Sequence, residues 1–207
     1  MLRIVLTLCA LFALSACGAG TAEPKWASDA AVAAARFVEP EGPRSLTLYT
    51  VVNNRSQSGA HSALLVKGSE TILFDPAGSW HHPRIPERND VHFGITPKMR
   101  AFYIDYHARE TFRVVEQTLD VPPEVAEMVA ARAKAYGAVP KAQCANSITS
   151  VLSDVPGFES IGRTWFPNRL SDDFGALPGV RTRVITDDDA DQNHGVLIVQ
   201  SGETAIQ

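Results

Sequence analysis

The stretch GAHSALLVKGSETILFDPAG, residues 59–78, is apolar in its middle and carries a titratable residue near each end. Residues 60–66 and 71–75 are rich in β-branched and other apolar residues, which is typical of strands. The intervening Lys67-Gly68-Ser69 supplies a glycine for positive φ, as a three-residue hairpin turn requires. The stretch therefore predicts two antiparallel strands joined by a tight turn.

The predicted register brings two titratable side chains together. With Lys67-Gly68-Ser69 as the turn, His61 lies directly across from Asp75 on one face of the sheet, with Cβ atoms ~5 Å apart. A slip of one residue would move Asp75 to the opposite face, so the pairing depends on the register. An aspartate beside a histidine fixes the tautomer and orientation of the ring and stabilises its charged form. The hairpin therefore predicts an oriented histidine.

The rest of the chain predicts an α+β fold, because strands come first, helices follow, and strands close the chain. The expected strands around the hairpin are 45–54, 102–108, 110–121, 181–185 and 195–200, and the expected helices are 122–137, 142–155 and 166–177. The proline-rich segment 76–97 is expected to be a long surface loop, which is a usual location for substrate selection.

The N-terminus has the pattern of an export signal. Residues 1–16 combine Arg3 with an apolar run that is too short to remain as a membrane span. Leu14-Ser15-Ala16-Cys17 resembles the bacterial lipobox, which implies cleavage before Cys17 and lipidation of its sulfur. The alternative is an ordinary secretory signal cut near Ala19 or Ala22.

Lipidation would make the membrane a partner of this chain. Residues 17–44, rich in Ala, Gly, Pro and Glu, are then expected to be a tether, within which Ser28-Asp29 and the alanines after it could form two helical turns. Gly18, in place of an aspartate after the lipidated cysteine, points to the outer membrane, facing the periplasm. The expected domain is 45–200, and 201–207 is expected to be a loose tail.

Composition excludes several classes of function. The net charge is −4, which does not favour nucleic acid as a partner. The chain has three cysteines, and only Cys144 would remain as a free thiol after cleavage and lipidation, so a disulfide framework is excluded. No cofactor or metal is expected, because the histidines at 81, 82, 92 and 107 match no tetrahedral zinc spacing.

Cys144 opens a predicted helix and lies at the end of its apolar stripe, which continues through Ile148, Val151 and Leu152. A helix N-terminus lowers the pKa of a thiol and supplies backbone N–H groups for a developing oxyanion. Cys144, as a thiolate nucleophile, would then complete a triad with the hairpin histidine and aspartate. The alternative is a small buried core residue.

The order of a histidine on a strand, a polar residue at the end of the next strand and a cysteine opening a helix resembles the circularly permuted papain-like cysteine hydrolases. This group includes permuted NlpC-type enzymes and relatives of lecithin–retinol acyltransferase. The resemblance covers roughly residues 45–155 and implies an antiparallel sheet packed against the helix that bears the nucleophile. It implies Cys144 as the nucleophile, His61 as the general base and Asp75 as the third member.

The resemblance also implies residues that contact the substrate. Tyr136-Gly137 is similar to the tyrosine-containing approach to the nucleophile in NlpC-type enzymes, so Tyr136 is expected in the substrate site. Gln143, directly before Cys144, is also expected there. Two departures concern the substrate: Ala145-Asn146 replaces the usual Ser-Gly, and the third member is an aspartate. The loop histidines His81 and His82 are the alternatives for that third position.

The expected function is an envelope-anchored thiol hydrolase or acyltransferase. The resemblance implies cell-wall peptide amides as first substrate class and lipid or thioester acyl groups as second. The alternatives are an envelope lipoprotein that binds peptide or lipid without catalysis, and a structural lipoprotein with a buried cysteine.

Overall fold

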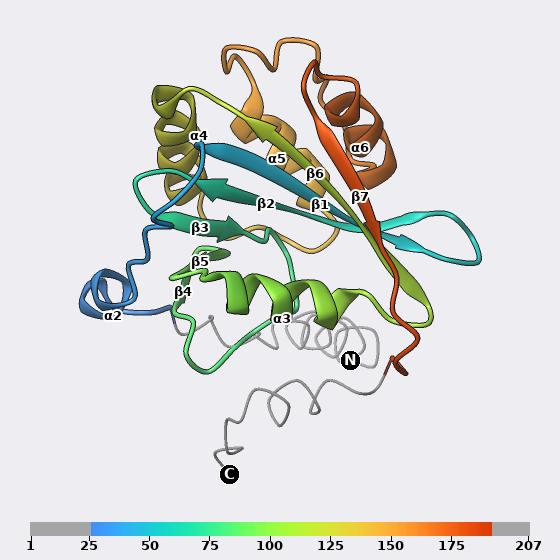
Figure 1. Ribbon diagram of the computed structural model, residues 1–207, viewed down its shortest axis with the longest axis horizontal. Coiled ribbons are helices and arrows are strands. Elements are labelled where there is room, and N and C mark those ends of the chain that lie inside the picture. Colours follow the sequence, from blue (N-terminus) through green and yellow to red (C-terminus); the bar gives the residue numbers. More distant parts are fainter. Residues whose placement is uncertain (1–25, 192–207) are drawn as a thin grey trace, which may run out of the picture.

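The computed structural model describes residues 26–191. An antiparallel sheet runs through the centre of this region (Figure 1), with the strand order β4-β5-β3-β2-β1-β6-β7. The strands are β1 (Ser45–Asn53), β2 (Gly59–Lys67), β3 (Thr71–Phe74), β4 (Glu87–Arg88), β5 (Val91–Phe93), β6 (Phe112–Asp120) and β7 (Arg181–Ile185). The helices are α2 (Asp29–Ala34), α3 (Pro97–His107), α4 (Pro123–Tyr136), α5 (Cys144–Leu152) and α6 (Pro167–Gly175). The predicted α+β class with an antiparallel sheet is confirmed.

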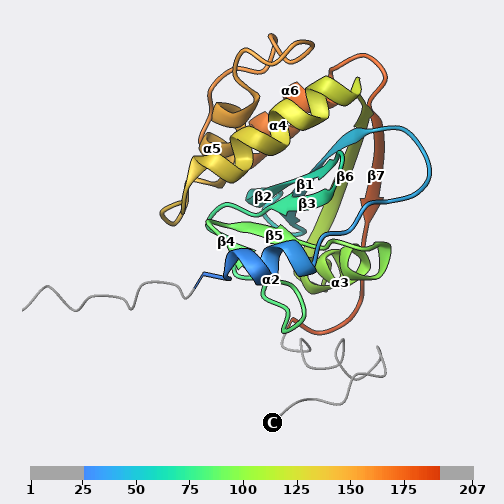
Figure 2. The ribbon, with the colours of Figure 1, turned by 90° about the vertical axis from the view of Figure 1, so that its left-hand side faces the viewer.

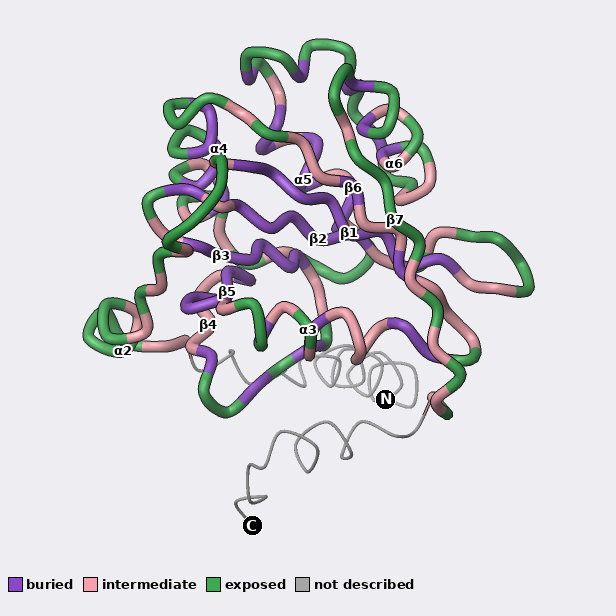
Figure 3. Tube along the Cα trace, viewed as in Figure 1, coloured by how far each residue is buried: buried purple, intermediate pink, exposed green. Residues whose placement is uncertain are grey.

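Helices cover both faces of the sheet. Figure 2 shows α4, α5 and α6 together on one face, with α3 on the other. The central strands β1 and β2 are therefore buried over most of their length (Figure 3), including several of their serine and threonine residues. Successive side chains of a strand point to opposite faces. On β2, for example, Leu64 packs with the three helices, whereas Ala63 and Leu65 pack with α3.

The register of the β2–β3 hairpin differs from the prediction. Lys67 pairs with Thr71 and Leu65 pairs with Leu73, so the turn is formed by residues 68–70 instead of 67–69. Neighbouring segments hold this turn in place, because the Ser69 hydroxyl donates to the Glu127 carboxylate on α4 at 2.9 Å. The predicted direct opposition of His61 and Asp75 is therefore wrong by two residues. A shift of two residues nevertheless keeps both side chains on the same face.

Residues 102–108 form the second half of α3, so the strand predicted there is wrong. The alternation in FYIDYHA imitates a strand, but the helix begins upstream at a capping signal. Thr96 is the N-cap, its hydroxyl accepts from the Met99 N–H at 3.2 Å, and Pro97 occupies the first helical turn. Proline at that position and threonine at the N-cap both favour a helix start.

The segment 76–97 contains a short hairpin, which the prediction of a loop missed. Strands β4 and β5 pair through Arg88 and Val91, and Asn89 and Asp90 between them have φ values of 52° and 60°. Two consecutive positive φ values are the signature of a type I′ turn, in which Asn and Asp are favoured. The predicted strand 195–200 lies outside the described residues.

Residues 26–44, which the sequence assigns to a tether, lie against the domain. The Ala27 N–H donates to the Glu87 carbonyl at 2.9 Å, and the Thr71 N–H donates to the Phe37 carbonyl at 2.8 Å. Helix α2 between these contacts confirms the predicted helical turns. The signal 1–16 and the tail 201–207 lie outside the described residues. Among residues 26–191, no helix combines the length and apolarity needed to cross a bilayer.

Candidate active site

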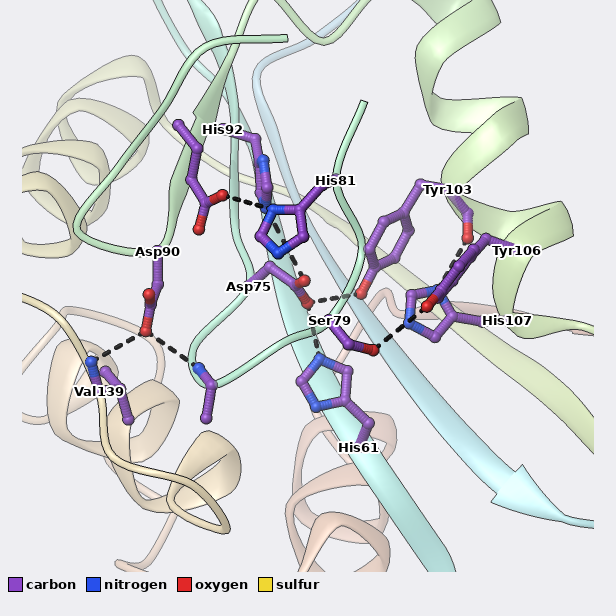
Figure 4. Close-up of polar contacts among 12 residues, drawn as sticks. His61, Asp75, Ser79, His81, Asp90, His92, Tyr103, Tyr106, His107 and Val139 are labelled. Carbon is purple, nitrogen blue, oxygen red and sulfur yellow. Dashed lines mark hydrogen bonds and ion pairs between the residues drawn. The ribbon is translucent and has the colours of Figure 1, made fainter. Parts of the chain in front are cut away.

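His61 and Asp75 form the centre of a buried polar cluster on the α3 face of the sheet (Figure 4). Nε2 of His61 lies 2.6 Å from Oδ1 of Asp75, although the two residues are diagonal neighbours in the observed register. Diagonal pairs on one face are within reach of long side chains. The predicted pair thus does come together, but as diagonal neighbours instead of directly opposed residues.

The Asp75 carboxylate is removed from solvent, with a side-chain exposure of 0%. Its Oδ1 also accepts a hydrogen bond from the Tyr103 hydroxyl at 2.8 Å, and Nε2 of His92 lies 3.8 Å from its Oδ2. Burial acts to raise the pKa of Asp75, but the charge of His61 and its hydrogen bond outweigh burial and hold that pKa well below the usual range. Asp75 is therefore an anion at neutral pH.

The buried anion determines the charge of His61. Burial acts to lower the pKa of the His61 ring, but the charge of Asp75 and the hydrogen bond to it raise this pKa to about 10. The ring therefore carries a proton on both nitrogens at neutral pH. Since Nε2 donates to Asp75, Nδ1 is the nitrogen that faces the remaining member of the site.

That remaining member is Cys144, at the N-terminus of α5, which lies beside the part of β2 that β3 does not cover. Strand β3 ends at Phe74, opposite Leu64, so within the described residues β2 has no ladder partner on that side before Leu64. The N-terminus of α5 approaches there, with Cys144 6% exposed. Helix α5 packs on the opposite face of the sheet from α3, so His61 and Cys144 approach each other from different layers.

Burial, His61 and two backbone N–H groups all influence the pKa of the Cys144 thiol. Burial raises its pKa, whereas the hydrogen bond with His61, the charge of His61, and the backbone N–H groups of Ser62 and Ala145 lower it. The net pKa lies below the ordinary thiol value, because these groups together outweigh burial. The arrangement can therefore hold a thiolate–imidazolium pair with Asp75 behind it.

A cleft of about 440 Å³ opens beside His61. Its walls come from β1, β2, the segment after β3 and the end of α3. In Figure 4, Ser79, Tyr106 and His107 lie beside the His61 ring, and the Ser79 and Tyr106 hydroxyls are 3.3 Å apart. The cleft is lined by Val51, Ala60, His61, Ala77, Gly78, Ser79, Tyr106, His107, Arg109, Phe112 and Asp191.

Asp90 fixes the segment between Asp75 and this cleft. Its Oδ2 accepts from the Ala77 N–H at 3.0 Å and from the Val139 N–H at 2.9 Å, as drawn in Figure 4. Ala77 has a φ of 58°, an uncommon value for a residue with a side chain. One carboxylate thus connects the end of β3 to the segment that leads into α5, which helps to place Asp75 and Cys144 relative to each other.

The other predicted site residues lie further from this centre. Tyr136 ends α4, is 38% exposed and packs on Phe74 with ring centroids 5.8 Å apart. Gln143 precedes Cys144, and its carbonyl accepts from the Ser147 N–H at 2.9 Å. Neither is among the described residues that line the cleft, and of the predicted triad only His61 is. Cys17 lies outside the described residues.

The loop histidines do not take the third position. His81 faces solvent and lies 2.8 Å from Glu87, whereas Nδ1 of His82 accepts from the Arg84 N–H at 3.2 Å. In the part of the chain that the structure describes, the group that could hold a metal ion is Asp105, Asp187 and Asp189. Arg109 already lies 3.1 Å from Asp105 and 3.6 Å from Asp189, so a buried guanidinium supplies positive charge there.

Sequence reasoning missed Tyr103 and His92. The strand predicted over 102–108 concealed the helical phase of Tyr103, and His92 was placed in a loop. The capping signal Thr96-Pro97 would have indicated the helix, but not that its seventh residue contacts Asp75. Searches of protein-family models, of curated proteins and of solved structures find no match to this chain.

Proposed function

We propose that this chain is a cysteine hydrolase or acyltransferase that acts on amide or ester bonds through Cys144, His61 and Asp75. The observation that carries the proposal is the position of His61, whose Nε2 lies 2.6 Å from a buried aspartate and whose positive charge lowers the pKa of the Cys144 thiol. A nucleophile, a base and an orienting acid in hydrogen-bonding sequence are the signature of covalent catalysis.

The reaction follows from the protonation states. The Cys144 thiolate attacks the substrate carbonyl carbon, and the C=O electron pair moves to oxygen. Collapse of this intermediate expels an amine or alcohol, which takes a proton from the His61 imidazolium. Neutral His61 then removes a proton from water or another acceptor, which attacks the thioester. The Cys144 thiolate departs, and the initial charges are restored.

The fold supports two further elements of the chemistry. Helix α5 begins at Cys144, so the first backbone N–H groups of this helix have no intrahelical acceptor and can stabilise an oxyanion. The resemblance to permuted papain-like enzymes is consistent with the order of His61, Asp75 and Cys144 along the chain. Cell-wall peptide amides remain the first substrate class proposed, and lipid or thioester acyl groups the second.

We further propose attachment to the bacterial outer membrane through a lipid on Cys17. The domain would then act on substrates in the envelope, close to the membrane surface. A non-catalytic lipoprotein that binds peptide or lipid is the second candidate function, favoured by one observation: Cys144 is only 6% exposed.

The test is the rate of alkylation of Cys144 as a function of pH. The full-length chain carrying Cys9→Ser and Cys17→Ser, in detergent, keeps Cys144 as its single thiol. We expect iodoacetamide to react well below the pH at which a free thiol ionises, about 8.5. Addition of His61→Ala should slow the reaction there. A thiol that reacts only after unfolding would contradict the enzymatic proposal.

A further inference from the structure

Two hydrogen-bond donors from different elements meet on one oxygen of Asp75. Nε2 of His61, on β2, lies 2.6 Å from Oδ1, and the Tyr103 hydroxyl, on α3, lies 2.8 Å from the same atom. Figure 4 shows them approaching the carboxylate from two sides. Two donors on one oxygen hold Oδ1 in place, whereas Oδ2 has no hydrogen-bond partner among the described residues.

Tyr103 is buried among aromatic side chains. It is 1% exposed, and its ring packs against Tyr49, Trp80 and His107 with centroid distances of 5.5, 5.4 and 4.4 Å. Its backbone carbonyl lies 2.8 Å from Nδ1 of His107. The hydroxyl is therefore aimed at Asp75 by a rigid aromatic cluster and cannot turn toward solvent.

The Tyr103 hydroxyl remains a donor over the whole working range of pH. Burial and the charge of Asp75 both raise the pKa of Tyr103 well above its ordinary value, so its proton is retained. His92 does not offer the same constraint. Its Nε2 lies 3.8 Å from the other oxygen, which is beyond hydrogen-bond distance.

We infer that Tyr103 is a positioning residue, which orients Asp75 toward His61 and so maintains the thiolate–imidazolium pair at Cys144. This inference rests on the proposed function. The relay then contains four side chains from four elements: Tyr103 on α3, Asp75 after β3, His61 on β2 and Cys144 on α5. Tyr103 is not among the described residues that line the cleft, and its hydrogen bond to Asp75 is the contact through which it acts.

The test compares Tyr103→Phe with Tyr49→Phe in the full-length chain that keeps Cys144 as its single thiol. Tyr49 is a matched control, because it is 1% exposed and packs against Tyr103 with tilted rings, and no hydrogen bond joins it to Asp75 among the described residues. The measurements are the pH profile of iodoacetamide alkylation and the low-field proton resonance of the His61–Asp75 hydrogen bond.

A hydrogen bond to a charged group is strong enough to change the population of the ion pair about tenfold. We therefore expect Tyr103→Phe to slow alkylation at pH 6 about tenfold and to shift or broaden the His61 resonance. Tyr49→Phe should do neither. Equal thermal unfolding of the two variants would show that the difference is not a loss of folding.

The outcomes separate the inference from the proposed function. If His61→Ala changes the profile and Tyr103→Phe does not, or moves it to lower pH, Tyr103 has no positioning role. If His61→Ala also leaves the profile unchanged, the thiolate–imidazolium pair itself is absent and the proposed function fails first. If Tyr49→Phe slows alkylation as much as Tyr103→Phe does, the effect belongs to packing of the cluster and the inference is overturned.

Discussion

The two faces of the central sheet are both buried, but they differ in chemistry. Against α4, α5 and α6 the sheet presents mainly leucine, valine, isoleucine and phenylalanine, and the buried polar residues of this layer include the uncharged Gln117 and Ser147. Against α3 the sheet presents Tyr49, and this layer also encloses Trp80, Asp75 and His92. Burial alone therefore does not distinguish scaffold from site; a buried charge with matched partners does.

The difference has an energetic reason. A carboxylate removed from water is costly unless ionic and hydrogen-bonding partners compensate it. Asp75 has such partners in His61 and Tyr103. The helix face has no comparable cost, so its contribution is stability. We expect substitutions on the two faces to have different effects. Those on the helix face should change the free energy of unfolding, and those on the α3 face should change the reactivity of Cys144.

The largest expected effect is that of Asp75→Asn. The amide keeps the shape but removes the charge that stabilises the His61 imidazolium, so turnover of an activated ester should fall about a thousandfold. Asp120→Asn is the control, because Asp120 is also a carboxylate paired with a cation, but its partner is Arg181 instead of His61. Equal losses in the two variants would refute the special role of Asp75.

Leu152→Ala should lower the stability of the packing on the helix face and leave the reactivity of Cys144 unchanged. Leu152 is 1% exposed at the end of α5, and truncating a buried leucine lowers the free energy of unfolding by about 2–5 kcal/mol. Urea unfolding measures this loss. The pH profile of Cys144 alkylation should remain that of the parent chain under conditions where the variant is folded. A shifted profile would show that the two faces are coupled.

The pH profile of the parent chain should show two steps. The lowered Cys144 pKa means that the thiolate forms below pH 8.5, and the raised His61 pKa means that the imidazolium persists until pH about 10. Alkylation should therefore reach a plateau and rise again near pH 10, when His61 loses its proton and leaves an unpaired thiolate. In His61→Ala a single step at higher pH should replace both, so that the rate at pH 6 falls about tenfold for each unit by which the Cys144 pKa rises. A single step in the parent chain would contradict the pair.

The smallest effect is expected for Tyr136→Phe. Tyr136 lies on the helix side, is partly exposed and keeps its packing on Phe74 without the hydroxyl. Alkylation and unfolding should both stay within about twofold of the parent values. Ester turnover is the measurement that decides whether Tyr136 belongs to the substrate site, since a clear loss of turnover would place its hydroxyl there.

Part of this molecule follows from local sequence. The strands β1, β2, β3, β6 and β7 and the helices α4, α5 and α6 correspond to predicted segments, because apolar periodicity, prolines at helix starts and glycines at ends are local signals. Cys144 at the start of α5 and the proximity of His61 to Asp75 were predicted from the same kind of signal. Helix α3 was not, because FYIDYHA alternates like a strand and its start lies five residues upstream.

Tertiary structure decided the register and the surroundings of the site. The β2–β3 turn consists of residues 68–70, one residue later in the chain than predicted. Contacts from α4 and from Phe37, both distant in sequence, hold it there. Tyr103 and Asp90 contribute through hydrogen bonds across 28 and 13 residues of chain. Local sequence determines which residues can form a strand, a helix start or an acid–base pair. Which partners meet around a buried charge depends on how separate layers pack, and no local pattern encodes that.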